Sequence, residues 1–330
     1  MANLIDPKQI LLEKIKAKGG WVNAHAHIDR AFILNEENFK LTDGTLQEKW
    51  DYPDKYKAAA SVDDIYANMV RAVEGFLAQG GQAIGAYIDV DPVIQDKAIK
   101  AGQRLQENYG DKLDIKFINQ VVKGVLDPEA RKWFEIGAEF VDFIGGLPEK
   151  DAGHEAEHLD ILFEAAKKNG GKPLHIHVDQ FNSPDQRDTE LLLQKTIEHN
   201  YQGKVVAIHS ISVGAQPKAY RQELYKKLKE AGIIFVACPT AWMDNSWVAG
   251  QPGDVIGPIH NSVTPVKEMI PAGLTVAIGS DDIQDIYKPF TDGDMWMELR
   301  FLLEAQRFYD LDALADIATV NGRKALFLED

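Results

Sequence analysis

Eight short runs rich in apolar and β-branched residues recur along this chain, and segments with helical periodicity separate most of them. Strands that alternate with helices form βαβ units and a parallel sheet, and eight repeats favour closure into a barrel over an open sheet. We therefore predict a (β/α)₈ TIM barrel of the α/β class. The expected strands are Trp21–Ile28, Ala83–Val90, Asp114–Val122, Phe140–Leu147, Lys172–Asp179, Lys204–Ser210, Ile233–Thr240 and Leu274–Asp281.

Amphipathic segments between these strands predict helices, and two closing helices follow the last strand. No linker or repeat interrupts the pattern, so residues 1–330 are expected to form a single domain. The expected helices are Val62–Gln79, Val93–Glu107, Glu155–Lys168, Thr189–His199, Lys218–Glu230 and Asp294–Phe308, with closing helices at Asp310–Thr319 and Asn321–Leu328.

One connection, Arg30–Ser61, is much longer than the others and contains several aromatic residues. Long loops in compact domains are usually functional or disordered. The aromatic content favours an ordered segment that covers a pocket.

Composition narrows the possible partners. The formal net charge is −15, which repels phosphate backbones and argues against nucleic acid. No stretch approaches the roughly 20 apolar residues that a membrane span needs, and the N-terminus indicates an amphipathic helix instead of a signal peptide. Cys238 is the single cysteine, so no intrachain disulfide is possible. We expect a cytoplasmic protein that acts on a small molecule, and a homo-oligomer is possible.

Histidine and aspartate residues stand at the carboxyl ends of four expected strands. Residues at i and i+2 of a strand point to the same face, so the two imidazoles of the first strand can reach one ion. In a parallel barrel these strand ends meet at one mouth, where active sites of this fold lie. The residues are His25 and His27 in the first strand, His177 in the fifth, His209 in the sixth and Asp281 in the eighth.

This set of donors points to metal chemistry. Imidazole nitrogens and a carboxylate oxygen suit one divalent ion, Zn²⁺ or Fe²⁺, which activates water and polarises a C=O or C=N group. A lone H-x-H is a weak pattern, and a strand histidine often only fills the core. Agreement between four strand ends favours a metal-dependent hydrolase.

Three other residue patterns have a simpler interpretation. His175 lies two residues deeper than His177, which favours barrel filling over ligation. His154-Glu-Ala-Glu-His158 matches the H-E-x-x-H pattern of zinc proteases. It lies in a highly charged segment without an apparent third ligand, which favours a solvated helix. Cys238 is expected to be a buried, unreactive thiol.

The combination of His25-x-His27, His177, His209 and Asp281 resembles the amidohydrolase superfamily, and more narrowly its cytosine deaminase branch with the related triazine hydrolases. The similarity extends from about Trp21 to Leu328 and includes Gly44-Thr-Leu46 and Gly279-Ser-Asp-Asp-Ile283. The flanking β-sandwich of many members is largely missing, so the chain is either a barrel-only member or trimmed.

The resemblance implies a role for each of these residues. His25, His27, His177 and Asp281 would bind one metal ion, and Asp281 would also pass a proton from water to the leaving nitrogen. His209 would help to polarise the water or the substrate. The residues expected to touch the substrate are Arg30, Lys123, Gln180 and Asp282.

The chain departs from the deaminase pattern in three places. Gln180 stands where deaminases of this branch have a glutamate proton shuttle, and an amide cannot exchange a proton. Val122, with Lys123 beside it, replaces an expected cytosine-binding glutamine, and Ser280 replaces a frequent histidine. Arg30 favours a substrate with anionic or polarised oxygens, because guanidinium binds such groups with two hydrogen bonds.

These departures leave three functions open. The first is deamination of an aminopyrimidine, aminotriazine or similar amidine such as a pterin. The second is ring opening of a cyclic amide or ureide, which the absent glutamate favours. The third is a metal-dependent binding protein that has lost catalysis, although retained His209 and Asp281 argue against it.

Overall fold

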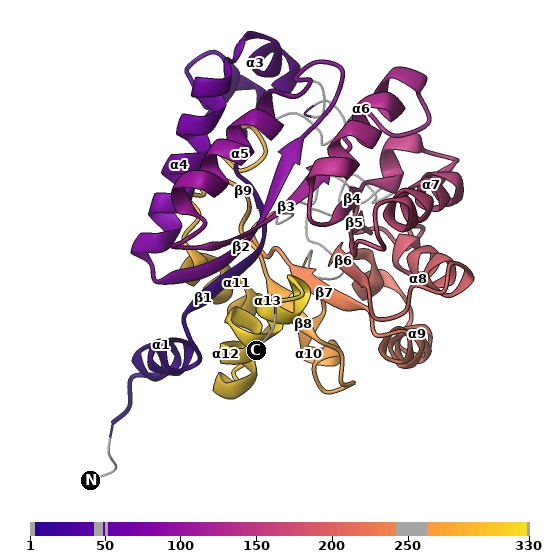
Figure 1. Cartoon of the computed structure of the whole chain (residues 1–330). Helices are drawn as coiled ribbons and strands as arrows, with labels where there is room; N and C mark the ends of the chain where they lie inside the picture. The colour runs from indigo at the N-terminus through magenta and orange to yellow at the C-terminus, as the bar shows by residue number, and fades with distance from the viewer. Residues whose placement is uncertain (1–3, 43–48, 50–51, 242–262, 329–330) are drawn as a thin grey trace.

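The computed structural model describes residues 4–42, 49, 52–241 and 263–328. Parallel strands form the centre of the molecule and helices surround them (Figure 1). The strands are β1 (Trp21–His27), β2 (Gly81–Asp89), β3 (Asp114–Gln120), β4 (Ile144–Gly146), β5 (Leu174–Val178), β6 (Val205–His209), β7 (Ile234–Ala237), β8 (Val276–Ile278) and β9 (Asp281–Asp282).

The strands close into a ring. One sheet has the order β3-β2-β1-β9 and the other has the order β4-β5-β6-β7-β8. A parallel bridge between Ile118 and Phe143 joins the two sheets at β3 and β4. On the opposite side, β8 continues through Gly279 and Ser280 into β9, which pairs with β1. This arrangement confirms the predicted (β/α)₈ barrel.

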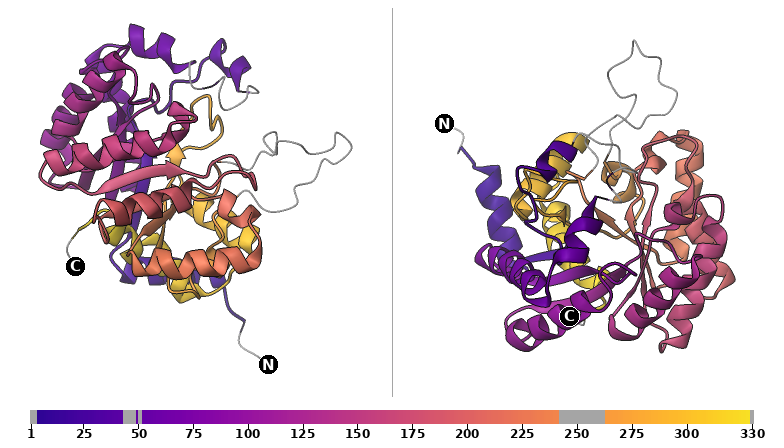
Figure 2. Two further views of the ribbon diagram at one scale, coloured as in Figure 1. Left: turned by 90° about the vertical axis from the view of Figure 1, so that its right-hand side faces the viewer. Right: turned by 90° about the horizontal axis from the view of Figure 1, so that it is seen from above.

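The helices pack around the ring, as the two further views show (Figure 2). Local signals fix several helix ends. Ser61 and Asp64 form a reciprocal capping box at the start of α4, and Asp127 caps α6 ahead of Pro128. The helices are α1 (Pro7–Ala17), α3 (Pro53–Ala59), α4 (Val62–Ala78), α5 (Lys97–Tyr109), α6 (Pro128–Phe140), α7 (Glu155–Lys168), α8 (Asp188–Glu198), α9 (Lys218–Glu230), α10 (Val266–Met269), α11 (Met295–Gln306), α12 (Leu311–Ala318) and α13 (Val320–Ala325).

Two expected strands differ from the structure. The strand predicted for Phe140–Leu147 is shorter, because Phe140 is the last residue of α6. This helix is not among those that the sequence analysis names. The strand predicted for Leu274–Asp281 divides into β8 and β9. Gly279 lies at this division, where a Cβ atom would approach the Cβ of His25 to 2.7 Å.

Helix α13 closes the end of the barrel opposite the mouth. Ala325 and Leu326 at its end are fully buried and pack against side chains inside the ring, including Ala24 and Val206. Nε2 of His175 donates a hydrogen bond to the carbonyl of Ala325 over 2.8 Å. Burial lowers the pKa of His175 to about 3, so its imidazole is neutral. These contacts agree with barrel filling as the role of His175.

The long first connection is ordered where it is described. Its helix α3 inserts Lys57, whose buried Nζ lies 2.6 Å from Asp89 at the end of β2 and 2.8 Å from Asp91. Further along the chain, the hydroxyl of Tyr287 donates to the carbonyl of Lys49. The segment therefore packs onto the rim of the mouth, as expected. Gly44-Thr-Leu46 and Trp50 lie outside the described residues.

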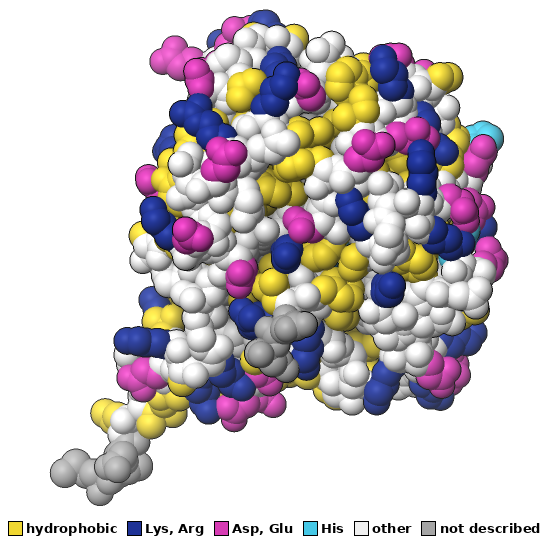
Figure 3. Space-filling view, viewed as in Figure 1, with side chains coloured by type: hydrophobic (Ala, Val, Ile, Leu, Met, Phe, Trp, Pro, Cys, Tyr) yellow, Lys and Arg dark blue, Asp and Glu magenta, His cyan; other side chains and the backbone are white. Residues whose placement is uncertain are grey.

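The outer surface carries mixed charge. On the face of Figure 3, basic and acidic side chains alternate, with apolar side chains between them. Among the described helices, none is both long enough and apolar enough to span a bilayer.

Candidate metal centre and active site

Four histidines and one aspartate meet at the carboxyl ends of β1, β5, β6 and β9. The ring centre of His25 lies 5.0 Å from that of His27, 4.9 Å from that of His177 and 5.7 Å from that of His209. Oδ1 of Asp281 lies 3.0 Å from Nε2 of His25 and 3.3 Å from Nε2 of His27. The structure therefore brings together all the ligands that the sequence indicates.

Two overlapping sets of donor atoms could each hold one ion. In each set the donor atoms lie within 4.8 Å of one another, and all side chains are buried. Both sets contain His25, so a single ion beside this residue would be within reach of both. The sets are His25, His177 and His209, and His25, His27 and Asp281.

His177 is oriented for ligation. Its Nδ1 lies 3.0 Å from the carbonyl oxygen of Gly146. Because a carbonyl can only accept, Nδ1 carries the proton and Nε2 keeps its lone pair. Nε2 is buried and has no hydrogen-bond partner, and an unpartnered buried nitrogen of this kind is costly without a ligand. A carbonyl that orients a metal-binding histidine from behind is a common feature of such sites. The residues therefore fit a metal ion.

Burial keeps the imidazoles in the form that metals bind. It lowers the pKa of His25 to about 4 and that of His209 to about 3, and it places the pKa of His177 well below its ordinary value. Burial alone would raise the pKa of Asp281, but hydrogen bonds from His25 and His27 hold it well below its usual range. At neutral pH the imidazoles of His25, His177 and His209 are thus neutral and the carboxylate of Asp281 is ionised.

The backbone at these strand ends is strained. His209 has a φ of 73° and Asp281 a φ of 61°, and Asp179 and Ser210 also have positive values. Non-glycine residues rarely adopt this conformation, which clusters at functional sites when the surrounding structure enforces it. The turn at each strand end directs the side chain toward the mouth of the barrel.

A small cavity adjoins the cluster, and its volume of about 30 Å³ is the space of about one water molecule. Gln120, Leu147 and Tyr287 are the lining residues that the sequence did not indicate. Gln120 shares strand parity with Val122, the position where a substrate-binding residue was expected, and this spacing could have identified it. The lining residues are His27, Arg30, Gln120, Val122, Leu147, His177, Gln180, Asp281, Asp282 and Tyr287.

Arg30 lines the cavity but is already bound to carboxylates. Its Nη2 lies 2.9 Å from Asp282, its Nη1 lies 3.2 Å from Asp89 and its Nε lies 3.6 Å from Asp285. These neighbours raise the pKa of Arg30 even though burial opposes the charge. An anionic substrate would compete with these carboxylates for the guanidinium, so the expected substrate contact of Arg30 stays a prediction.

The other expected substrate contacts have different positions. Asp282 and Gln180 line the cavity. Lys123 does not belong to the lining residues, and its Nζ instead binds Asp54 in the first turn of α3 over 2.7 Å. The amide of Gln180 donates to Glu149, a buried residue that the sequence did not single out.

The H-E-x-x-H segment forms no metal site with its two histidines. His154 is largely exposed, whereas His158 is fully buried in α7. The Nδ1 of His158 lies 2.7 Å from Asp151, and its Nε2 accepts from the backbone of Leu147. The expectation of a solvated helix face was therefore wrong for His158, which joins α7 to the end of β4.

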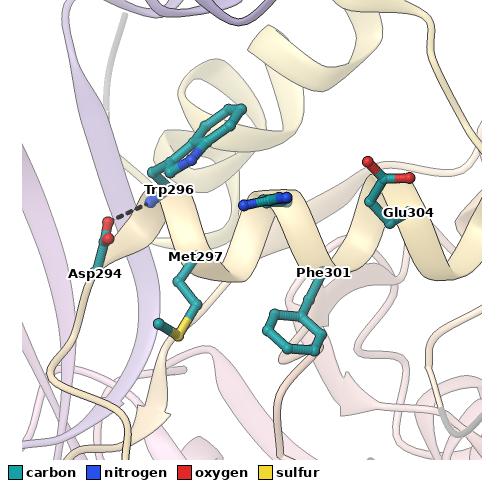
Figure 4. A pocket seen from close by; sticks show the side chains of 6 residues that line it. Asp294, Trp296, Met297, Phe301 and Glu304 are labelled. Carbon is teal, nitrogen blue, oxygen red and sulfur yellow. Dashed lines mark hydrogen bonds between the residues drawn. The ribbon is translucent and has the colours of Figure 1, made fainter.

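A second cavity lies on the outside of the barrel and has a different character. Its lining comes entirely from α11 and the residue before it, and Figure 4 shows Met297 and Phe301 on one side of the helix and Trp296 on the other. The hydrogen bond drawn there, from the Trp296 backbone to Asp294, only caps the helix. This cavity has none of the clustered histidines of the mouth, so the mouth is the candidate active site.

Comparisons with known proteins agree with this site. The sequence model of the amidohydrolase family matches residues 17–330. An uncharacterized protein of Haemophilus influenzae is 47% identical over 268 residues, which is 80% of this chain and 95% of that protein. N-isopropylammelide isopropyl amidohydrolase of Pseudomonas sp. is 26% identical over 343 residues, covering 96% of this chain and 77% of the relative.

Solved structures show the same architecture. The 5-methylcytosine deaminase of Klebsiella pneumoniae, liganded with 5-fluorocytosine, superimposes with a TM-score of 0.84 at 25% identity. The match covers 94% of this chain and 75% of that one. Together with the site geometry and the family match, these similarities establish that the chain belongs to the amidohydrolase family.

Proposed function

We propose that this enzyme, a hydrolase of C–N bonds other than peptide bonds, removes an amino or alkylamino group from a small nitrogen heterocycle. An aminopyrimidine or aminotriazine is the substrate class that its named relatives suggest. The observation that carries the proposal is the convergence of four histidines and Asp281 beside a cavity that Arg30, Gln180 and Asp282 also line.

We assign the metal ion to His25, His27, His177 and Asp281, with His209 beside it. Nitrogen donors with one carboxylate favour Zn²⁺ or Fe²⁺. When bound, the ion lowers the pKa of water and polarises the C–N carbon that is attacked.

The protein side chains transfer the proton, hydrogen-bond to the substrate and orient its ring. Asp281 is ionised, so it accepts a proton from the attacking water and returns it to the departing nitrogen. His209 is neutral and lies in the same cluster, so its imidazole can hydrogen-bond to the oxygen that develops on the substrate. Gln180 and Gln120 supply amides along the cavity that can orient the ring.

A release assay tests this function. The protein is loaded with Zn²⁺ or Fe²⁺ and incubated with cytosine, 5-methylcytosine, N-isopropylammelide and pterin, and the released ammonia or isopropylamine is measured. We expect turnover of at least one compound and its loss in Asp281→Asn. Tight binding of these compounds without any product would contradict the proposal and favour a binding protein.

Ring opening of a cyclic amide or ureide is a second candidate, and the observation that favours it is Gln180. A ring nitrogen that leaves as part of the opened product needs no separate proton shuttle at this position. The two reactions differ in their products, because ring opening yields an acid and releases no ammonia. Mass spectrometry of the reaction mixtures distinguishes them by a gain of one water.

A further inference from the structure

The side chain of Glu149 lies behind Gln180, away from the metal cluster. Glu149 is 7% exposed and belongs to the short 3₁₀ turn Pro148–Asp151 that follows β4. Its Oε2 accepts a hydrogen bond from Nε2 of Gln180 over 2.6 Å. Because Gln180 lines the cavity, the opposite end of the same amide, the carbonyl oxygen, is the end available to a substrate.

Gln186 fixes the other oxygen of Glu149. The carbonyl of Gln186 accepts from the backbone N–H of Phe181 over 2.9 Å, so the NH₂ group of Gln186 must be the end that reaches Glu149 Oε1. The backbone N–H of Gln180 also donates to Oε1, over 3.3 Å. Oε1 therefore always acts as an acceptor, and Oε2 is the atom that interacts with the Gln180 amide.

From this geometry we propose that Glu149 is a positioning residue that determines which end of the Gln180 amide faces the substrate. The inference rests on the proposed function, and it names a feature of the substrate. In the arrangement of the structure the carbonyl oxygen of Gln180 faces the cavity and can only accept. In this arrangement, with Glu149 ionised, the site favours a heterocycle with a ring N–H next to the reacting carbon, as in a lactam or ureide.

The carboxyl group also gives this contact a dependence on pH. Burial, followed by the charge of Asp188, raises the pKa of Glu149 to about 8. Asp188 in turn lies near two further acidic residues, Asp179 and Glu155. A proton on Oε2 would donate to the Gln180 carbonyl and turn the NH₂ group to the cavity. The site would then favour a ring nitrogen with a free lone pair.

Two pyrimidines distinguish the two arrangements. Uracil has an N–H at ring position 3, whereas cytosine has a lone pair there. We would measure Kd for both by calorimetry with the metal-free protein, which should not turn cytosine over, from about pH 6.5 to about pH 9, across the titration of Glu149. A mismatched donor pair costs about tenfold or more in Kd. We expect the preference for uracil over cytosine to rise by about that factor in the wild type as Glu149 ionises.

Glu149→Gln should fix the site in the low-pH arrangement. The new amide keeps an acceptor for Gln186, so its NH₂ group faces Gln180 and turns the NH₂ group of Gln180 to the cavity. We expect the ratio of the Kd values for uracil and cytosine in this variant to stay, at every pH, at the value that the wild type has at low pH. Glu157→Gln, an exposed change on α7, is the matched control and should behave as the wild type. If the ratio of the two Kd values depends on pH in Glu149→Gln as it does in the wild type, the proposal is overturned.

A measurement without any ligand separates this inference from the proposed function. In protein labelled with ¹⁵N-glutamine, the side-chain amide signal of Gln180, assigned by its loss in Gln180→Ala, should shift with a midpoint near pH 8. Glu149→Gln should abolish this shift. A Gln180 signal that does not titrate would refute the role of Glu149 even if the enzyme deaminates cytosine. A titrating signal would support that role even if no heterocycle is turned over.

Discussion

Replacement of Arg30 by methionine tests whether this residue holds the rim of the site together. The change removes a guanidinium from within 3.6 Å of Asp282, Asp89 and Asp285. Lys57 remains 2.6 Å from Asp89, so Asp89 keeps one cation. Asp282 loses the cation at 2.9 Å and stays buried beside another carboxyl group. Removal of one partner from a buried pair costs about 3–5 kcal/mol.

Urea unfolding measures this loss as a change in the free energy of unfolding. The metal is removed with a chelator in both proteins, because a change in metal affinity would otherwise alter the apparent stability. Arg104→Met is the matched control, since Arg104 pairs with Asp63 over 2.6 Å on the surface. The control should lose no more than about 1 kcal/mol.

A double variant tests the cause of the loss. Arg30→Met combined with Asp282→Asn removes the unpaired charge as well as the cation, so it should recover a substantial part of the stability. A loss below about 1 kcal/mol in Arg30→Met would refute the reasoning, because the carboxylates would then be stable without the guanidinium. A large loss that the double variant does not recover would point to packing against Tyr287 instead.

Three further changes address the metal centre and its surroundings. His177→Ala should lower the bound zinc measured by atomic emission at least tenfold, whereas His154→Ala, which changes an exposed residue, should leave it unchanged; equal loss in both would contradict the ligand assignment. Glu149 binds a proton more tightly when folded, with a pKa raised from 4.5 to about 8, so the wild type loses stability as the pH rises through this range. The stability of Glu149→Gln relative to the wild type should therefore increase between about pH 6 and pH 9, and a constant difference would argue against burial of an ionising group. Gly279→Ala places a Cβ atom 2.7 Å from that of His25, so unfolding should show a loss of about 1–3 kcal/mol, and no loss would mean that β8 shifts freely.

The clustering of the candidate metal ligands was predictable because their signal is local. Two histidines at i and i+2 share one face of any strand, and a parallel barrel brings the carboxyl ends of its strands to one mouth. The spacing of His25 and His27 and the positions of His177 and Asp281 therefore needed no knowledge of tertiary contacts. The structure places all of these residues in one cluster.

Residues that depend on contacts between distant segments were not predictable in the same way. Glu149 follows β4 as one of many surface-like acidic residues, and only folding places it against Gln180. Lys123 was expected at the substrate, but Asp54 in the long first connection binds it. His158 was expected in solvent, although its partner Asp151 lies only seven residues away, because the highly charged segment gave no sign that the helix face is buried.

Helix α13 closes the end of the barrel opposite the histidines, and this position affects the order in which the barrel can form during synthesis. Ala325 and Leu326 fill the lower end of the ring, and Ala325 supplies the acceptor for His175. During synthesis the first strands emerge long before these residues, so the growing chain must hold an open-ended ring until its last helix arrives. We expect a gain of protease resistance during translation once α13 has emerged from the ribosome.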